Sequence, residues 1–100
     1  HHERAQTLKN KLLKAGLPVM PGPSHIVPVL VGDPVRCKQA SYILLNAHDI
    51  YVQPINYPTV LRGTERLRFT PSPFHSDQDM DRLAAALRQV WERLGLKAAA

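Results

Sequence analysis

The stretch RGTERLRFTPSPFH, residues 62–75, decides the fold that we expect for this sequence of 100 residues. If the five residues that begin at Arg66 form a β-strand, alternation sends Leu67 and Phe69 to one face of a sheet. The same alternation sends Arg66 and Arg68 to the opposite face. The strand would then have an apolar face that packs in a core and a cationic face that lies outside it.

The cationic face permits two interpretations. Arginine side chains are mostly exposed in folded proteins, so this face can simply be in contact with solvent. It can also form an anion site that faces a cleft. Alternation alone leaves both interpretations open, and the remainder of the sequence has to decide between them.

Composition indicates one small globular domain with a modest core, because the chain has 100 residues, 44% hydrophobic and 21% charged. Thirteen Lys and Arg residues against eight Asp and Glu residues give a formal charge of +5, which would suit an anionic partner. These charges are dispersed, and no basic patch is interleaved with aromatic residues. We therefore expect no nucleic-acid partner.

Apolar periodicity predicts three helices. Ala5, Leu8 and Leu12 form the stripe of an amphipathic helix over residues 2–15. A second helix over residues 34–47 begins at an Asp33 N-cap followed by Pro34, and its inner stripe should contain Cys37, Ala40, Ser41, Leu44 and Ala47. The last helix begins at Ser76 with a capping box to Asp79 and ends at Gly95.

Two further strands are predicted, and each contains a proline. Residues 25–31, HIVPVLV, read as a strand that Pro28 places at a sheet edge or gives a bulge. Residues 50–55, IYVQPI, read as a short strand broken by Pro54. A loop of ten residues, 56–65, then leads to the strand at Arg66, and its length suggests a function.

The element order of helix, strand, helix, strand, strand, helix predicts an α/β fold of the α+β type. We expect a two-layer sandwich in which the helices pack on one face of a small mixed or antiparallel sheet. The other face, with Arg66 and Arg68, would be covered by water or by another domain.

The sequence shows no self-contained catalytic or metal site. The histidines have no ligand spacing beyond the adjacent His1 and His2, which a tag remnant or a truncation explains better than a metal. The single cysteine, Cys37, excludes an intrachain disulfide, suggests a reducing compartment and is expected to be a buried, inert thiol. No apolar run approaches the ~18 residues that span a bilayer, so we expect a soluble chain with no membrane partner.

Three motifs together, GPSHIVPVLVGDP, IYVQPINYPTV and RGTERLRFTPSPFH, resemble the C-terminal part of the 5-aminolevulinate synthase family. This family is a branch of the pyridoxal-phosphate-dependent α-oxoamine synthases. The resemblance runs from about Leu12 to Leu94, and the version is like those of α-proteobacteria. It implies the small C-terminal domain of a fold-type-I pyridoxal-phosphate-dependent transferase, with residues 1–16 as the end of a linking helix and residues 17–100 as the domain.

The resemblance implies an acyltransferase that, as a homodimer, condenses glycine with succinyl-CoA to 5-aminolevulinate, CoA and carbon dioxide in haem biosynthesis. It implies cytoplasmic localisation in a bacterium, or the mitochondrial matrix in a eukaryote. Two alternatives stay open: a related enzyme, glycine C-acetyltransferase or 8-amino-7-oxononanoate synthase, and a stand-alone basic module that binds a polyanion. Polyanion binding would show a steep dependence on salt concentration.

The resemblance also implies two substrate-binding residues. Arg68 corresponds to the arginine that binds the carboxylate of the amino acid substrate, and a guanidinium can hold a carboxylate through two parallel hydrogen bonds. Thr59 corresponds to a threonine beside the succinyl carboxylate, where a hydroxyl offers one neutral donor. Arg66 inherits no role and is expected to lie in solvent or at an interface.

The catalytic residues of the family would lie upstream of His1. None of the lysines in the chain is in the expected context of the Schiff-base lysine. We therefore expect this chain by itself to be inactive and to bind no pyridoxal phosphate, although the complete enzyme would use it.

Overall fold

The computed structural model describes residues 2–99 and contains three helices and three strands. In chain order these are α1 (His2–Lys14), β1 (Val27–Leu30), α2 (Pro34–His48), β2 (Gln53–Ile55), β3 (Arg66–Phe69) and α3 (Asp77–Leu94). The order agrees with that expected from the sequence, and so do the helix bounds within one or two residues. The strands are shorter than expected, most of all β2, which was expected to begin at Ile50.

The last strand in the chain, β3, is the centre of the sheet. The strand order is β1-β3-β2, and both neighbours run antiparallel to β3. The sheet is thus antiparallel, one of the two arrangements that the sequence left open. Arg66 and Arg68 therefore lie on the one strand that pairs with both of the others.

Both strand prolines lie where their missing N–H groups do not weaken the pairing with β3. The carbonyl of Pro28 accepts a hydrogen bond from the Met20 amide at 2.8 Å, so the polar groups of this residue face away from β3. Pro54 is the Cα partner of Leu67, between the two residues of β2 that pair with Arg66 and Arg68. Pro28 accordingly lies in an edge strand, as predicted.

The alternation along β3 is confirmed. Leu67 is fully buried and Phe69 is 6% exposed, whereas Arg66 and Arg68 are half-buried. Residues directly opposite each other in antiparallel strands share a face, so Val27 joins Phe69 on the apolar face. This face supplies the sheet side of the core.

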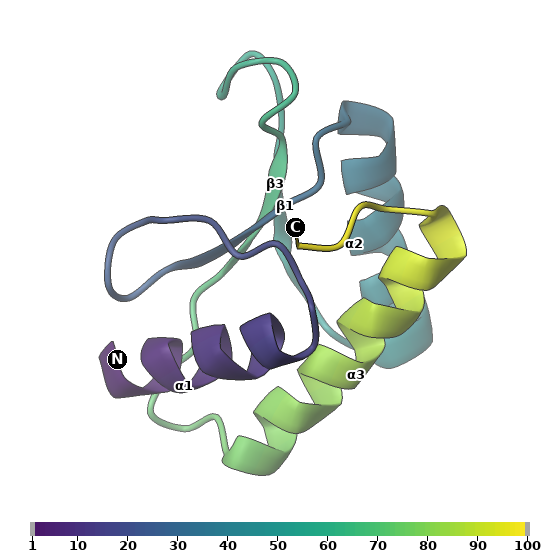
Figure 1. The fold of residues 1–100 in the computed structure, drawn as a ribbon. Coiled ribbons are helices and arrows are strands. Elements are labelled where there is room, and N and C mark those ends of the chain that lie inside the picture. The colour runs from purple at the N-terminus through teal and green to yellow at the C-terminus, as the bar shows by residue number, and fades with distance from the viewer. Residues whose placement is uncertain (1, 100) are drawn as a thin grey trace.

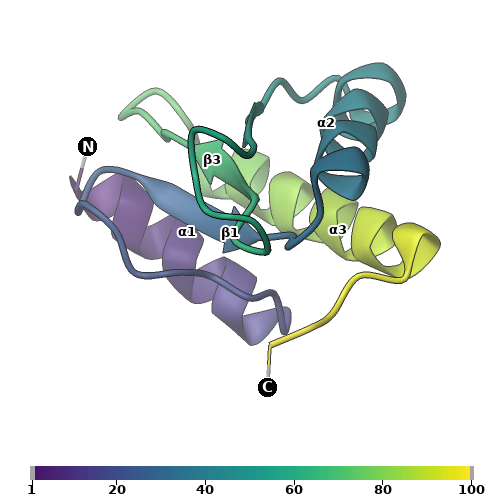
Figure 2. The same cartoon turned by 90° about the horizontal axis from the view of Figure 1, so that it is seen from above.

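The three helices supply the other side of that core. Helices α1 and α2 contact the strands, and α3 packs on both of these helices (Figure 1). In the view from above, the loop between β2 and β3 lies in front of the sheet, between α1 and α2 (Figure 2). Buried side chains from the three helices and from β1 and β3 form one cluster that includes Leu8, Leu44, Leu67 and Trp91.

Helix ends follow the predicted capping chemistry. The Asp33 side chain accepts from the Arg36 amide at 2.8 Å, and Pro34 begins α2. Ser76 and Asp79 form the reciprocal capping box of α3. The backbone N–H of Ser76, bonded to the Asp79 carboxylate, lowers the pKa of that carboxyl group below its ordinary value.

Two ion pairs join α1 to the first turns of α3. Arg4 Nη1 lies 2.7 Å from Asp77 Oδ1, and Lys11 Nζ lies 2.7 Å from Asp81 Oδ1. The Arg4 hydrogen bond lowers the pKa of Asp77. Arg4 and Lys11 of α1 therefore each have a carboxylate partner on α3.

One detail of α2 differs from the sequence expectation. Ala47, placed on the inner stripe of α2, is exposed, and Ile43 packs against the core in its stead. The chain turns at Asp49, whose φ is 56°, and Ile50 then fills the space beyond the last turn of the helix.

The face that carries the arginines is partly covered by this chain itself, which corrects the expectation that only water or another domain would cover it. A Cβ on Gly22 would lie 3.3 Å from Pro28 Cγ, so the loop after α1 passes over Pro28, the Cα partner of Arg68. Within residues 2–99, no helix has the length and apolar character needed to cross a bilayer.

Leu67→Ala should lower the free energy of unfolding by about 2 to 5 kcal/mol, because it leaves a cavity beneath the central strand. Leu61→Ala is the matched control, since Leu61 is 79% exposed, and it should change stability by about 0.5 kcal/mol or less. Urea unfolding of both variants measures the difference. Equal losses would show that β3 does not anchor the core.

Candidate functional site

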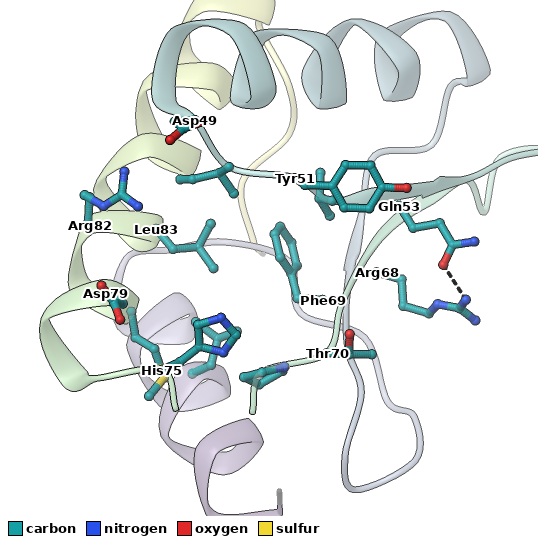
Figure 3. Close-up of a pocket in the computed structure, with 15 residues that line it drawn as sticks. Asp49, Tyr51, Gln53, Arg68, Phe69, Thr70, His75, Asp79, Arg82 and Leu83 are labelled. Carbon is teal, nitrogen blue, oxygen red and sulfur yellow. Dashed lines mark hydrogen bonds between the residues drawn. The ribbon is translucent and has the colours of Figure 1, made fainter. Parts of the chain in front are cut away.

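A pocket of about 530 Å³ lies beside the end of β3 and reaches the first turns of α3. Its lining includes the apolar side chains of Phe69, Met80 and Leu83. Figure 3 shows Phe69 and Leu83 between two groups of polar side chains. The pocket combines an apolar floor with a few polar groups, as small-molecule sites do.

Arg68 and Gln53 form one polar end of this pocket (Figure 3). They are Cα partners across the β2–β3 pairing, and Arg68 Nη2 donates a hydrogen bond to Gln53 Oε1. Within residues 2–99, no carboxylate forms a hydrogen bond or an ion pair with Arg68. The guanidinium is therefore held by a neutral partner, and no carboxylate of this part of the chain neutralises its charge.

The opposite end of the pocket contains His75, Asp79 and Arg82. Each of these groups has a structural hydrogen bond: His75 Nδ1 accepts from the Ser72 amide, and Arg82 Nη1 donates to the His48 carbonyl at 2.9 Å. Asp79 caps α3, as described above. These residues order the rim of the pocket.

Arg66 differs from Arg68 although both lie on the same face of β3. Arg66 Nε donates to the Thr64 carbonyl at 2.9 Å, two residues earlier in the chain. Arg66 is also absent from the pocket lining. The structure thus brings only one of the two arginines to the pocket.

Thr59 lies in the loop that joins β2 to β3, at the end of the hairpin away from Arg68. Its side chain is exposed, and its amide donates to the Asn56 carbonyl at 2.9 Å. It does not line the pocket. The two residues singled out by the resemblance are therefore on the same hairpin but are not brought together within this chain.

The loop that carries Thr59 is ordered by its own contacts. The Arg62 guanidinium lies over the Tyr57 ring, 4.0 Å from its centroid. Asn56 Nδ2 donates to the Pro34 carbonyl at 3.4 Å, which links the start of the loop to α2. A long loop held in this way can present a side chain in a defined position.

Glu65 is a buried carboxyl group that sequence reasoning missed. It is 1% exposed, and its Oε1 accepts from the Gly63 amide at 3.0 Å. Its Oε2 has no hydrogen-bond partner within the described chain. The only local signal was Gly63 two residues earlier, whose φ of 86° favours glycine and aims its amide back at the carboxylate.

Cys37 is a buried thiol, as expected. It is fully buried on α2, and its Sγ lies 3.3 Å from the Arg66 carbonyl. Burial raises the pKa of Cys37 from 9.0 to about 11, so it carries no thiolate near neutral pH. This protonation state does not suit a nucleophile.

No group of three or more His, Cys, Asp or Glu residues within the described chain is arranged to hold a metal ion. His1 lies outside the described residues, so the expectation for the His1 and His2 pair stays a prediction.

Comparison with known proteins identifies the relatives of this chain. The family model described as aminotransferase class I and II matches residues 1–87. The 5-aminolevulinate synthase of Bradyrhizobium diazoefficiens is 60% identical over 96 residues, which are 96% of this chain and 24% of that protein. The mitochondrial 5-aminolevulinate synthase of Yarrowia lipolytica is 58% identical over 90% of this chain and 16% of its own length.

The resemblance found in the sequence motifs is thereby confirmed, including its α-proteobacterial members. The chain spans about a quarter or less of the length of these curated relatives. Among solved structures, Sphingomonas wittichii serine palmitoyltransferase matches with a TM-score of 0.82 and 20% identity, over 93% of this chain and 24% of that chain. This likeness confirms the α/β fold class.

The buried thiol gives a prediction on stability at high pH. The folded thiol, with a pKa of about 11, binds its proton more tightly than an unfolded thiol at 9.0. The free energy of unfolding should therefore fall as the pH rises from about 9 to about 11. Urea unfolding across this range measures the fall, and Cys37→Ala should show a smaller one. Parallel pH profiles for the two proteins would contradict the assignment.

Proposed function

We propose that this chain, which belongs to the class I and II aminotransferase family, is part of a 5-aminolevulinate synthase that condenses glycine with succinyl-CoA. The products are 5-aminolevulinate, CoA and carbon dioxide. Identity of 60% over nearly the whole chain supports this assignment over the related α-oxoamine synthases. The observation that carries it is the Arg68 guanidinium, which lines a pocket with a neutral partner.

Arg68 is proposed to bind the glycine carboxylate. Its planar fork can donate two parallel hydrogen bonds to a carboxylate and so fix the direction of the substrate. This contact holds the α-carbon in one orientation while a proton is removed from it. The uncompensated charge of Arg68 favours an anionic substrate at this end of the pocket.

Pyridoxal phosphate is the proposed cofactor of the complete enzyme, and a serine palmitoyltransferase of similar fold has been solved with the aldimine of pyridoxal phosphate and myriocin bound. When bound, it supplies an electron sink for the negative charge that develops at the α-carbon. The residues of this chain fit the substrate rather than the cofactor, because the pocket lining beside Arg68 includes no lysine among the described residues. The groups that hold the cofactor are proposed to lie in the rest of the enzyme.

Thr59 is proposed to contact the succinyl carboxylate. Its exposed position on an ordered loop leaves the hydroxyl accessible to a substrate bound between this domain and the rest of the enzyme. A neutral hydroxyl adds one hydrogen bond and helps to distinguish succinyl from acyl groups that lack the second carboxylate.

The remaining assembly is also part of the proposal. Residues 1–16 would end a linking helix and residues 17–100 would form the small domain of a homodimeric enzyme. Two large apolar side chains, Tyr51 and Phe74, are 79% and 95% exposed, which suits a surface that packs on the rest of the protein. The relatives are bacterial or mitochondrial enzymes, so we place this one in the bacterial cytoplasm or the mitochondrial matrix.

Arg68→Ala in the complete enzyme should raise the KM for glycine roughly 10- to 100-fold, because hydrogen bonds to charged groups contribute about 1.5 to 3 kcal/mol. The KM for succinyl-CoA should change much less. Arg66→Ala is the matched control and should leave both values near those of the wild type. Steady-state kinetics with each substrate varied in turn provides the measurement. An unchanged KM for glycine in Arg68→Ala would refute the assignment.

Thr59→Val keeps the shape of the side chain and removes its hydroxyl. The preference of the complete enzyme for succinyl-CoA over butyryl-CoA, measured as a ratio of kcat/KM values, should fall roughly 2- to 10-fold. Thr7→Val, on α1, serves as a control and should keep the wild-type ratio. If the ratio is unchanged in Thr59→Val, this threonine does not contact the succinyl carboxylate.

A further inference from the structure

Gln53 is the side chain of this chain that touches the Arg68 guanidinium. It lies on β2 as the Cα partner of Arg68, so both side chains project from the same face of the sheet. Arg68 Nη2 donates to Gln53 Oε1, and both residues line the pocket (Figure 3). The contact therefore joins two strands at the place where the proposed substrate carboxylate would bind.

This contact reduces the freedom of Arg68 before any ligand arrives. An arginine side chain has several rotatable bonds, and a free one loses rotamer entropy when it is fixed. A guanidinium has five N–H donors, of which Gln53 uses one. The others stay available for two parallel hydrogen bonds to a carboxylate.

The chemical nature of the partner matters as much as its position. A Glu or Asp at this position would also orient the guanidinium, but it would form an ion pair and compete with an incoming carboxylate. The amide of Gln53 accepts a hydrogen bond and carries no charge. It orients Arg68 without neutralising its positive charge, which stays available for an anionic ligand.

We propose that Gln53 is a positioning residue that aligns Arg68 for the glycine carboxylate and that must be neutral to do so. This inference rests on the function proposed above for Arg68. It assigns to β2 a direct part in substrate recognition, in addition to its part in the sheet.

Three variants in the complete enzyme with its cofactor test the proposal. Gln53→Met removes the acceptor and keeps the length of the side chain, and Gln53→Glu keeps the shape and adds a charge. Gln89→Met, at an exposed position on α3, is the matched control. The measurements are the dissociation constant for glycine by calorimetry and the KM values for both substrates, with circular dichroism as a check of folding.

We expect Gln53→Met to weaken glycine binding about 3- to 10-fold and Gln53→Glu to weaken it more, about 10- to 100-fold. The KM for succinyl-CoA and the properties of Gln89→Met should stay close to the wild type. A structural role alone predicts the opposite order, because glutamate keeps the shape of glutamine better than methionine does. It also predicts that both KM values change together, and either result would overturn the proposal.

Arg68→Ala, measured beside these variants, separates failure of this inference from failure of the proposed function. If Arg68→Ala weakens glycine binding and both Gln53 variants match the wild type, only the role of Gln53 is refuted. If Arg68→Ala also matches the wild type, the assignment of the carboxylate site fails, and the role of Gln53 fails with it.

Discussion

The position of β3 at the centre of the sheet is the constraint on which the rest of the structure depends. It pairs with both other strands, and its alternating sequence gives it one buried and one half-buried face. Leu67 and Phe69 bind the sheet to the helices through the hydrophobic effect. The same geometry then requires Arg66 and Arg68 to project from the other face, so one strand supplies both the core and the candidate site.

The two prolines of the sheet are compatible with this arrangement because their backbone nitrogen and carbonyl groups face away from β3. Pro28 turns its polar groups to the segment before β1, whose Met20 amide bonds to its carbonyl. Pro54 lies on an edge strand between the two residues that pair with the arginines. The central strand contains no proline, so its N–H groups are available to both neighbours.

The separate roles of the two arginines arise from their neighbours. Arg66 is bound to the Thr64 carbonyl, whereas Arg68 is bound to Gln53 at the end of a pocket. Both arginines are direct neighbours of Leu67 in the sequence, so local sequence alone does not distinguish their roles. The buried Glu65 likewise had no clear signal in the sequence, because its backbone carbonyl is bonded to the distant Val31 and Gly32 amides. Ala47 was misplaced for a similar reason: Ile43 packs against the core in its stead, and Ile50 fills the space beyond the end of the helix.

The sequence by itself determined the helices, their caps and the two faces of β3, because these features follow from periodicity and from local hydrogen bonds. Its motifs also indicated the family and singled out Arg68 and Thr59. Only the tertiary structure decided which strand is central, which arginine lines the pocket and which residue holds it. These outcomes depend on contacts between residues far apart in the chain, such as Gln53 with Arg68, and local pattern does not encode strand order or register.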